Sequence, residues 1–211
     1  MNIPKSLGAV YAALLAPMLA LAPVLMPLLA LAACGPGAPA ARPPLEGARI
    51  GGAFALVDQD GRTVTDRSFP GQWRIMYFGY TFCPDVCPLD MQKVGAGLRL
   101  LEKSDPGIAA KVTPIFVTTD PERDTPAVLK QFVTAFHPRM IGLTGSPAAI
   151  AAVEKAYSVF AAKAAPAAGG GYLVNHSRQA YLMSPQNKPI ALVPADESPQ
   201  AVADTLKAWI A

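Results

Sequence analysis

Two cysteines four residues apart, Cys83 and Cys87, lie where an apolar run ends and a helical pattern begins. The run at 74–79 (RIMYFG) is typical of a buried central strand. Apolar residues recur at helical spacing after the cysteines, at Met91, Val94, Leu98 and Leu101. Because four residues span about one helical turn, both sulfurs can face the same way at the start of a helix. The pattern around the pair therefore predicts a strand that leads directly into a helix.

Strand-like and helix-like patterns alternate along the rest of the chain. Further strand patterns occupy 53–57, 63–64, 112–118, 140–143, 173–174, 180–183 and 188–193. Further helical patterns begin at 126, at 146–147 and at 198, and the Ala/Gly-rich segment 161–171 is expected to be a surface loop. The 211 residues suffice for one full domain. We predict a single α/β domain whose late strands form an antiparallel hairpin.

The amino-terminal segment 1–33 has the order of a secretory signal, with Lys5 followed by an uncharged apolar stretch at 7–33. Its ending, Leu-Ala-Ala before Cys34, resembles the bacterial lipobox, in which the cysteine is lipidated. The stretch is also long enough to span a bilayer as an uncleaved anchor. We expect lipidation of Cys34, with an uncleaved anchor as the second alternative and a cleaved, soluble form as the third. All three place the domain outside the cytoplasm.

The segment that follows, 34–49, is rich in Pro, Ala and Gly and is expected to be a tether, so that the folded domain spans 50–211. The formal net charge of the chain is +3, and no run of Lys and Arg forms a basic stripe. These features argue against a nucleic-acid partner. The membrane is the expected attachment.

The three cysteines of an exported chain leave an odd one, and lipidation of Cys34 would leave Cys83 and Cys87 as a matched pair. A helix amino terminus favours the thiolate, which binds metals or attacks disulfides. A structural disulfide is the simpler alternative, but a bridge over one turn would stabilise the fold little. The pair is therefore interpreted as functional.

The chain has only two histidines. His137 ends a predicted helix, where its interpretation is a favourable charge at the helix carboxyl end. His176 lies between two strand-like pieces and becomes a credible third ligand beside the two thiols. Two soft thiolates and one imidazole suit copper, or zinc less specifically. Met91 could offer a thioether, but its helical spacing with Val94 favours core packing.

Four motifs in series resemble the Sco (SenC) family of copper-delivery proteins for cytochrome c oxidase. They are GYTFCPDVCP at 79–88, DPERDTP at 120–126, GLTG at 142–145 and YLVNHS at 172–177. The resemblance implies a thioredoxin-like fold with additional strands, and a membrane tether facing the periplasm. It also implies that Cys83, Cys87 and His176 bind copper, as Cu(I), Cu(II) or both, for delivery to the binuclear site of oxidase subunit II. A disulfide between the two cysteines would need a periplasmic thioredoxin-like reductant before loading.

One departure from the family pattern lies beside the predicted ligand, where Asn175 replaces the usual Asp. An amide can accept a hydrogen bond but cannot supply negative charge near the metal. The leading interpretation is a metallochaperone and not an enzyme. The alternative is a thiol–disulfide reductase of the client's copper-ligand cysteines, or a redox sensor. An inert exported binding module ranks third.

Overall fold

A mixed seven-stranded sheet forms the centre of the molecule in a computed structural model that describes residues 42–166 and 171–210. Its strands are β1 (Ala55–Asp58), β2 (Thr63–Thr65), β3 (Trp73–Gly79), β4 (Val112–Thr118), β5 (Ile141–Thr144), β8 (Ala180–Met183) and β9 (Pro189–Val193). Their order is β2-β1-β5-β4-β3-β8-β9. The neighbours β3, β4 and β5 run parallel, whereas β8 and β9 pair antiparallel, which confirms the predicted late hairpin.

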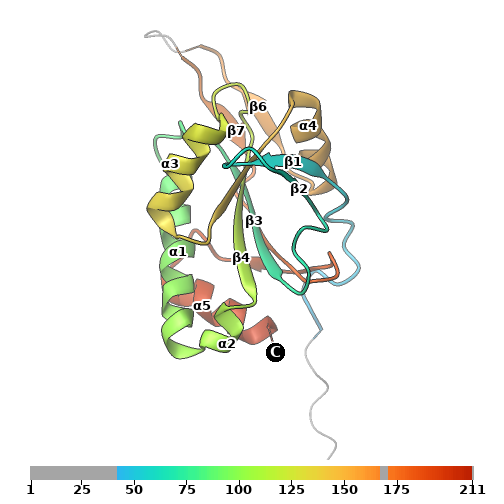
Figure 1. The fold of residues 1–211 in the computed structure, drawn as a ribbon, viewed down its shortest axis with the longest axis vertical. Helices are drawn as coiled ribbons and strands as arrows, with labels where there is room; N and C mark the ends of the chain where they lie inside the picture. The colour runs from blue at the N-terminus through green and yellow to red at the C-terminus, as the bar shows by residue number, and fades with distance from the viewer. Residues whose placement is uncertain (1–41, 167–170, 211) are drawn as a thin grey trace, which may run out of the picture. The chain divides into compact units, whose positions relative to one another are not determined.

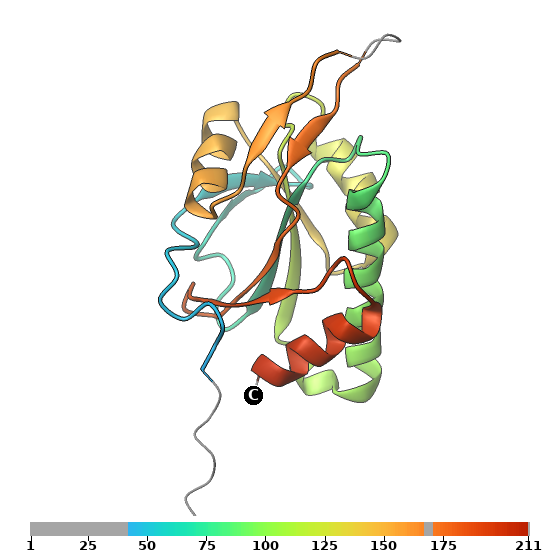
Figure 2. The ribbon, with the colours of Figure 1, turned by 180° about the vertical axis from the view of Figure 1, so that it is seen from behind.

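Five helices cover the two faces of this sheet within the described residues. They are α1 (Val86–Ser104), α2 (Pro106–Ala109), α3 (Pro126–Phe136), α4 (Pro147–Ala156) and α5 (Pro199–Trp209). Figures 1 and 2 show α1, α3 and α5 on one side of the sheet and α4 on the other. Neighbouring residues of β3 point to opposite faces of the sheet. Tyr77 packs in the core on the side of α1, α3 and α5, and Phe78 packs in the core on the side of α4. The α/β class predicted from the sequence is confirmed.

Helix starts follow from capping residues that precede proline. Thr125, Ser146 and Ser198 are the N-caps of α3, α4 and α5, and each side-chain oxygen accepts a backbone N–H of the first turn. A proline follows each cap, where its fixed φ suits a helix and its missing N–H costs nothing. The expected starts near 126, 146–147 and 198 are therefore correct.

The segment 161–171 departs from the expected surface loop. Its first residues form β6 (Ala161–Lys163), which pairs antiparallel with β7 (Val174–His176) in a separate two-stranded sheet. The loop prediction was wrong for these residues, because backbone hydrogen bonds to β7 outweigh the weak strand preference of alanine. Figure 2 shows the β6–β7 pair rising beyond the central sheet.

The described chain from Arg42 onward belongs to one compact unit. Within the predicted tether, the Leu45 N–H donates to the Ile190 carbonyl at 3.0 Å, and Leu45 packs against the core. The signal or anchor at 1–33 and the lipidation site Cys34 lie outside the described residues. In the part of the chain that is described, no helix has both the length and the hydropathy to cross a bilayer.

Candidate metal centre

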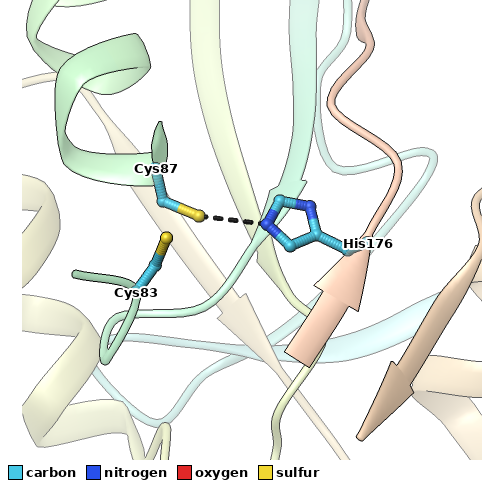
Figure 3. Close-up of side chains that lie close together, drawn as sticks. All are labelled: Cys83, Cys87 and His176. Carbon is cyan, nitrogen blue, oxygen red and sulfur yellow. Dashed lines mark hydrogen bonds between the residues drawn. The ribbon is translucent and has the colours of Figure 1, made fainter. Parts of the chain in front are cut away.

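Three donor side chains, two thiols and one imidazole, converge beside the carboxyl end of β3. The sulfurs of Cys83 and Cys87 and a ring nitrogen of His176 all lie within 4.8 Å of one another. Figure 3 shows the two sulfurs and the imidazole edge pointing toward a common centre. Cys83 comes from the turn after β3, Cys87 from the first turn of α1 and His176 from the end of β7. The structure thus brings together the three residues selected from the sequence.

The two cysteines differ in their surroundings. Helix α1 begins at Val86, so that Cys83 lies before the helix and Cys87 lies in its first turn. The spacing had suggested instead that both cysteines belong to the start of the helix. Cys83 is half-buried, whereas the Cys87 side chain is fully buried. Cys83 is therefore the less enclosed of the two cysteines.

Gly79 provides the space for the Cys87 sulfur at the end of β3. A Cβ atom on Gly79 would lie 2.8 Å from Cys87 Sγ and 2.9 Å from Tyr77 Cε1. Both distances are well below the roughly 3.5–4.0 Å of a favourable contact between non-bonded heavy atoms. The close passage of strand and sulfur therefore requires glycine at this position.

A buried carboxylate holds the cysteine turn against the end of β4. Asp124 accepts hydrogen bonds from the Thr81 backbone N–H at 3.0 Å and from the Thr81 hydroxyl at 2.6 Å. It also accepts one from the Thr118 hydroxyl at 2.6 Å. Since Thr81 lies two residues before Cys83, these bonds restrict the position of the Cys83 sulfur.

The imidazole of His176 is oriented by its own backbone and by two aromatic rings. Its Nδ1 lies 2.8 Å from the Ser177 carbonyl oxygen, which can only accept, so Nδ1 carries the hydrogen and donates it. The other nitrogen, Nε2, is left with a lone pair 3.2 Å from Cys87 Sγ. The rings of Tyr77 and Tyr80 meet the imidazole edge-to-face, with centroid distances of 6.5 Å and 5.9 Å. This tautomer presents Nε2 as a metal ligand.

Burial keeps both partners of this contact neutral. Burial raises the pKa of the Cys87 thiol well above its usual range, and burial lowers the pKa of His176. The Cys87 S–H therefore donates to Nε2 of the neutral ring. Burial therefore opposes, at Cys87, the thiolate that a helix amino terminus was expected to favour. A bound metal ion would take the place of this proton.

The other residues considered from the sequence lie elsewhere or play other roles. His137 is buried at the end of α3, with Nε2 3.3 Å from Glu102 Oε1, and burial lowers its pKa. Its interpretation as a charged helix terminus was therefore wrong. Met91 packs in the core, as predicted. Asn175 is exposed and lines an open pocket of about 350 Å³ together with Cys83 and His176.

A charged network next to the centre, formed by Asp90, Arg178 and Tyr77, was not predicted from the sequence. Asp90, fully buried on α1, accepts a hydrogen bond from the Tyr77 hydroxyl at 2.9 Å. It also accepts two from Arg178, from Nε at 2.8 Å and from Nη2 at 2.7 Å. One signal was present in the sequence, because Asp90 falls on the same helix face as Met91 and Val94. A carboxylate on a buried face needs a partner.

A second cluster links the cysteine turn to the β6–β7 pair. The Arg123 guanidinium lies 3.8 Å from the ring centroid of Tyr172 and 5.0 Å from that of Phe82. It pairs with Asp120, which also accepts a hydrogen bond from the Tyr172 hydroxyl at 2.8 Å. Because Phe82 directly precedes Cys83, this cluster lies on the Cys83 side of the centre.

The donor set itself fits a soft metal ion. Thiolates select copper(I), zinc or iron–sulfur clusters, and imidazole suits copper and zinc. Among the described residues this is the one group of three His, Cys, Asp or Glu side chains that could hold an ion. Three protein donors are one fewer than the four of a closed structural zinc site. The arrangement therefore leaves a position open to a further ligand.

Comparison with known proteins places this centre in a family. The SCO1/SenC family model matches residues 42–211. The chain is 43% identical over 139 residues to "Protein SCO1 homolog 1, mitochondrial" of Arabidopsis thaliana. The matched region covers 66% of this chain but only 40% of that protein. It is 40% identical over 163 residues to "Protein SenC" of Rhodobacter capsulatus, which covers 77% of this chain and 72% of that protein.

Solved structures agree with these relatives. The structure of Arabidopsis thaliana ScoI with copper bound matches with a TM-score of 0.70 and 38% identity, over 75% of this chain and 97% of that chain. Bradyrhizobium japonicum ScoI with copper bound matches with a TM-score of 0.68 and 41% identity, over 76% and 99%. The fold is accordingly thioredoxin-like with additional strands, as the sequence resemblance implied. By its family model, its relatives and its fold, this chain belongs to the SCO1/SenC family.

Proposed function

We propose that this protein is a copper metallochaperone which binds one copper ion through Cys83, Cys87 and His176 and delivers it during the assembly of cytochrome c oxidase. The observation that carries the proposal is the convergence of the three donor atoms within 4.8 Å. Support comes from the copper-bound structures of two relatives with the same fold. The proposed recipient is the binuclear copper site of oxidase subunit II.

The unequal burial of the sulfurs suits transfer of the ion. Cys83 is half-buried and borders the open pocket, whereas Cys87 is enclosed. A thiolate of the recipient can approach the copper from the Cys83 side, because three protein donors leave one position free. We expect ligand exchange to begin at Cys83 and to end with release from Cys87 and His176. The protein is then a carrier and not an enzyme.

The alternative function is a thiol–disulfide reductase or redox sensor. It is favoured by one observation, namely that both cysteines are free and that one of them, Cys83, is only half-buried. In that role Cys83 would attack a client disulfide and Cys87 would resolve the mixed disulfide. Simple exchange does not require His176, whereas copper binding does. This residue therefore separates the two functions.

We also propose that the domain is membrane-tethered and faces the periplasm, through a lipid on Cys34 or through an uncleaved anchor. A tether raises the effective concentration of the domain near a membrane-bound oxidase. In an oxidising compartment the two sulfurs can form a disulfide, which binds no copper as thiolates do. A periplasmic thioredoxin-like reductant is accordingly a second proposed partner.

Gene deletion followed by rescue with single variants tests this function. Loss of the protein should lower cytochrome c oxidase activity most when copper is scarce, and added copper should restore part of it. If the protein is a chaperone, a His176→Ala copy fails to rescue. If it is a reductase, His176→Ala rescues, while Cys83→Ser and Cys87→Ser do not. Full rescue by all three variants would exclude both functions.

A further inference from the structure

Two of the three donor residues, Cys87 and His176, each have a charged residue close by in the sequence. Asp90 lies three residues after Cys87 on α1, and Arg178 lies two residues after His176. These two neighbours form a bidentate pair, with Nε–Oδ2 at 2.8 Å and Nη2–Oδ1 at 2.7 Å. We propose that Arg178 is a positioning residue, which holds His176 opposite Cys87 through Asp90 and so sets the affinity of the centre for copper. This inference rests on the proposed function.

The pair has the geometry of a strong contact. The Asp90 carboxylate is fully buried, and the Tyr77 hydroxyl donates a further hydrogen bond to it at 2.9 Å. A fork of two charge-assisted hydrogen bonds fixes the direction of approach as well as the distance. The Arg178 side chain is 40% exposed, so its guanidinium reaches inward from the surface to meet this carboxylate. The carboxylate is thus held from β3 and from the His176 segment at the same time.

The segment that carries His176 has few other attachments to α1. Strand β7 pairs with β6 and not with the central sheet. Within the described residues, three hydrogen bonds connect α1 to the segment 174–179: the Cys87–His176 contact and the two bonds from Arg178 to Asp90. The first of these is the contact that a bound metal replaces. The Arg178 bonds are therefore the attachment that persists when copper enters or leaves.

A short path leads from Arg178 to the ligand nitrogen. The Ser177 carbonyl, which accepts the Nδ1 hydrogen of His176, belongs to the peptide unit that joins Ser177 to Arg178. Fixing Arg178 therefore fixes the carbonyl that sets both the tautomer and the ring direction. Loss of such outer partners typically costs roughly 10–100-fold in metal affinity. We expect a loss of this size when Arg178 can no longer bind Asp90.

The test uses Arg178→Met, which keeps an unbranched stem as far as the position of Nε and removes the guanidinium with its donors. Arg139→Met is the matched control, since Arg139 has a similar side-chain exposure of 37% and pairs with Glu102 at 2.8 Å. The readouts are Cu(I) affinity by competition with a chelator and the nitrogen hyperfine coupling of the Cu(II) form. Arg178→Met should lose roughly 10–100-fold in affinity and most of that coupling. Arg139→Met should lower the melting temperature and leave both copper readouts unchanged.

A second variant and a double variant make the result decisive. Arg178→Lys keeps a cation opposite Asp90 but lacks the fork, so it should fold and bind copper with intermediate affinity. The His176→Ala/Arg178→Met protein should bind no more weakly than His176→Ala alone, because both changes act through the same ligand. Parent-like copper affinity and coupling in Arg178→Met and Arg178→Lys, or additive losses in the double variant, would overturn the positioning role. Parent-like binding by His176→Ala would instead overturn the proposed function.

Discussion

The close passage of Gly79 past the Cys87 sulfur allows a prediction for a single added methyl group. In Gly79→Ala, the new Cβ would lie 2.8 Å from Cys87 Sγ, 2.9 Å from Tyr77 Cε1 and 3.2 Å from Phe116 Cε2. The side chains of all three neighbours are fully buried, so none can move into solvent. The overlap with the sulfur is about 1 Å relative to a favourable contact. The sulfur or the strand must therefore shift.

Overpacking of this kind typically costs about 1–3 kcal/mol. A loss of about 2 kcal/mol would lower the melting temperature of a domain of this size by roughly 4–8 °C. Because the displaced atom is a proposed ligand, we also expect copper affinity to fall by roughly 10–100-fold. Thermal unfolding of the copper-free protein and chelator competition measure the two effects separately.

The matched control for this change is Gly107→Ala. A Cβ on Gly107, in the short helix α2, would meet nothing within 4 Å. Alanine is also the better helix former, so this control should be neutral or slightly stabilising and should bind copper like the parent. If Gly79→Ala has the melting temperature and copper affinity of Gly107→Ala, the packing argument around Cys87 is incorrect.

Three further predictions concern residues around or beyond the centre. Asn175→Asp should tighten copper binding in chelator competition, because a carboxylate adds negative charge near the ion, and equal affinities would show the position to be neutral. Burial raises the pKa of Glu154 to about 7, so the folded protein keeps this proton to a higher pH than the unfolded chain does. The free energy of unfolding should therefore fall as pH rises from about 4.5 through 7, by about 1 kcal/mol after solvent screening. Urea unfolding across this range should show that slope in the parent and not in Glu154→Gln. Cleavage before Cys34 and lipidation of its sulfur should appear in the intact mass of the membrane-extracted protein, and a mass that retains residues 1–33 would refute processing.

Much of the fold follows from local patterns in the sequence. Strand β3 was predicted because its apolar run is long, and the starts of α3 and α4 because a capping residue stands before a proline. Strand β6 was missed, since three residues of an alanine-rich segment carry no strand signal of their own. They become a strand only because β7 lies beside them.

The ligand set was predictable because few residue types can hold a soft metal. Cys83, Cys87 and His176 stand out by chemistry alone, before any distance is known. The pairing of Asp90 with Arg178 was not predictable in this way, since the partners are 88 positions apart and meet only through the folded topology. The burial of Cys87 was missed for a similar reason, because a pattern of spacing does not show how much surrounding structure covers a sulfur.

The central claim is that copper is bound by two sulfurs and one nitrogen from these three residues. X-ray absorption at the copper edge, on reduced protein loaded with one equivalent of copper, measures that ligand set directly. We predict two sulfur ligands and one imidazole nitrogen in the parent, and loss of the nitrogen in His176→Ala. The control His137→Ala should keep the spectrum of the parent, because His137 pairs with Glu102 and lies outside the group of three donors. A His176→Ala spectrum identical to that of the parent, or a parent site without two sulfurs, would contradict the account.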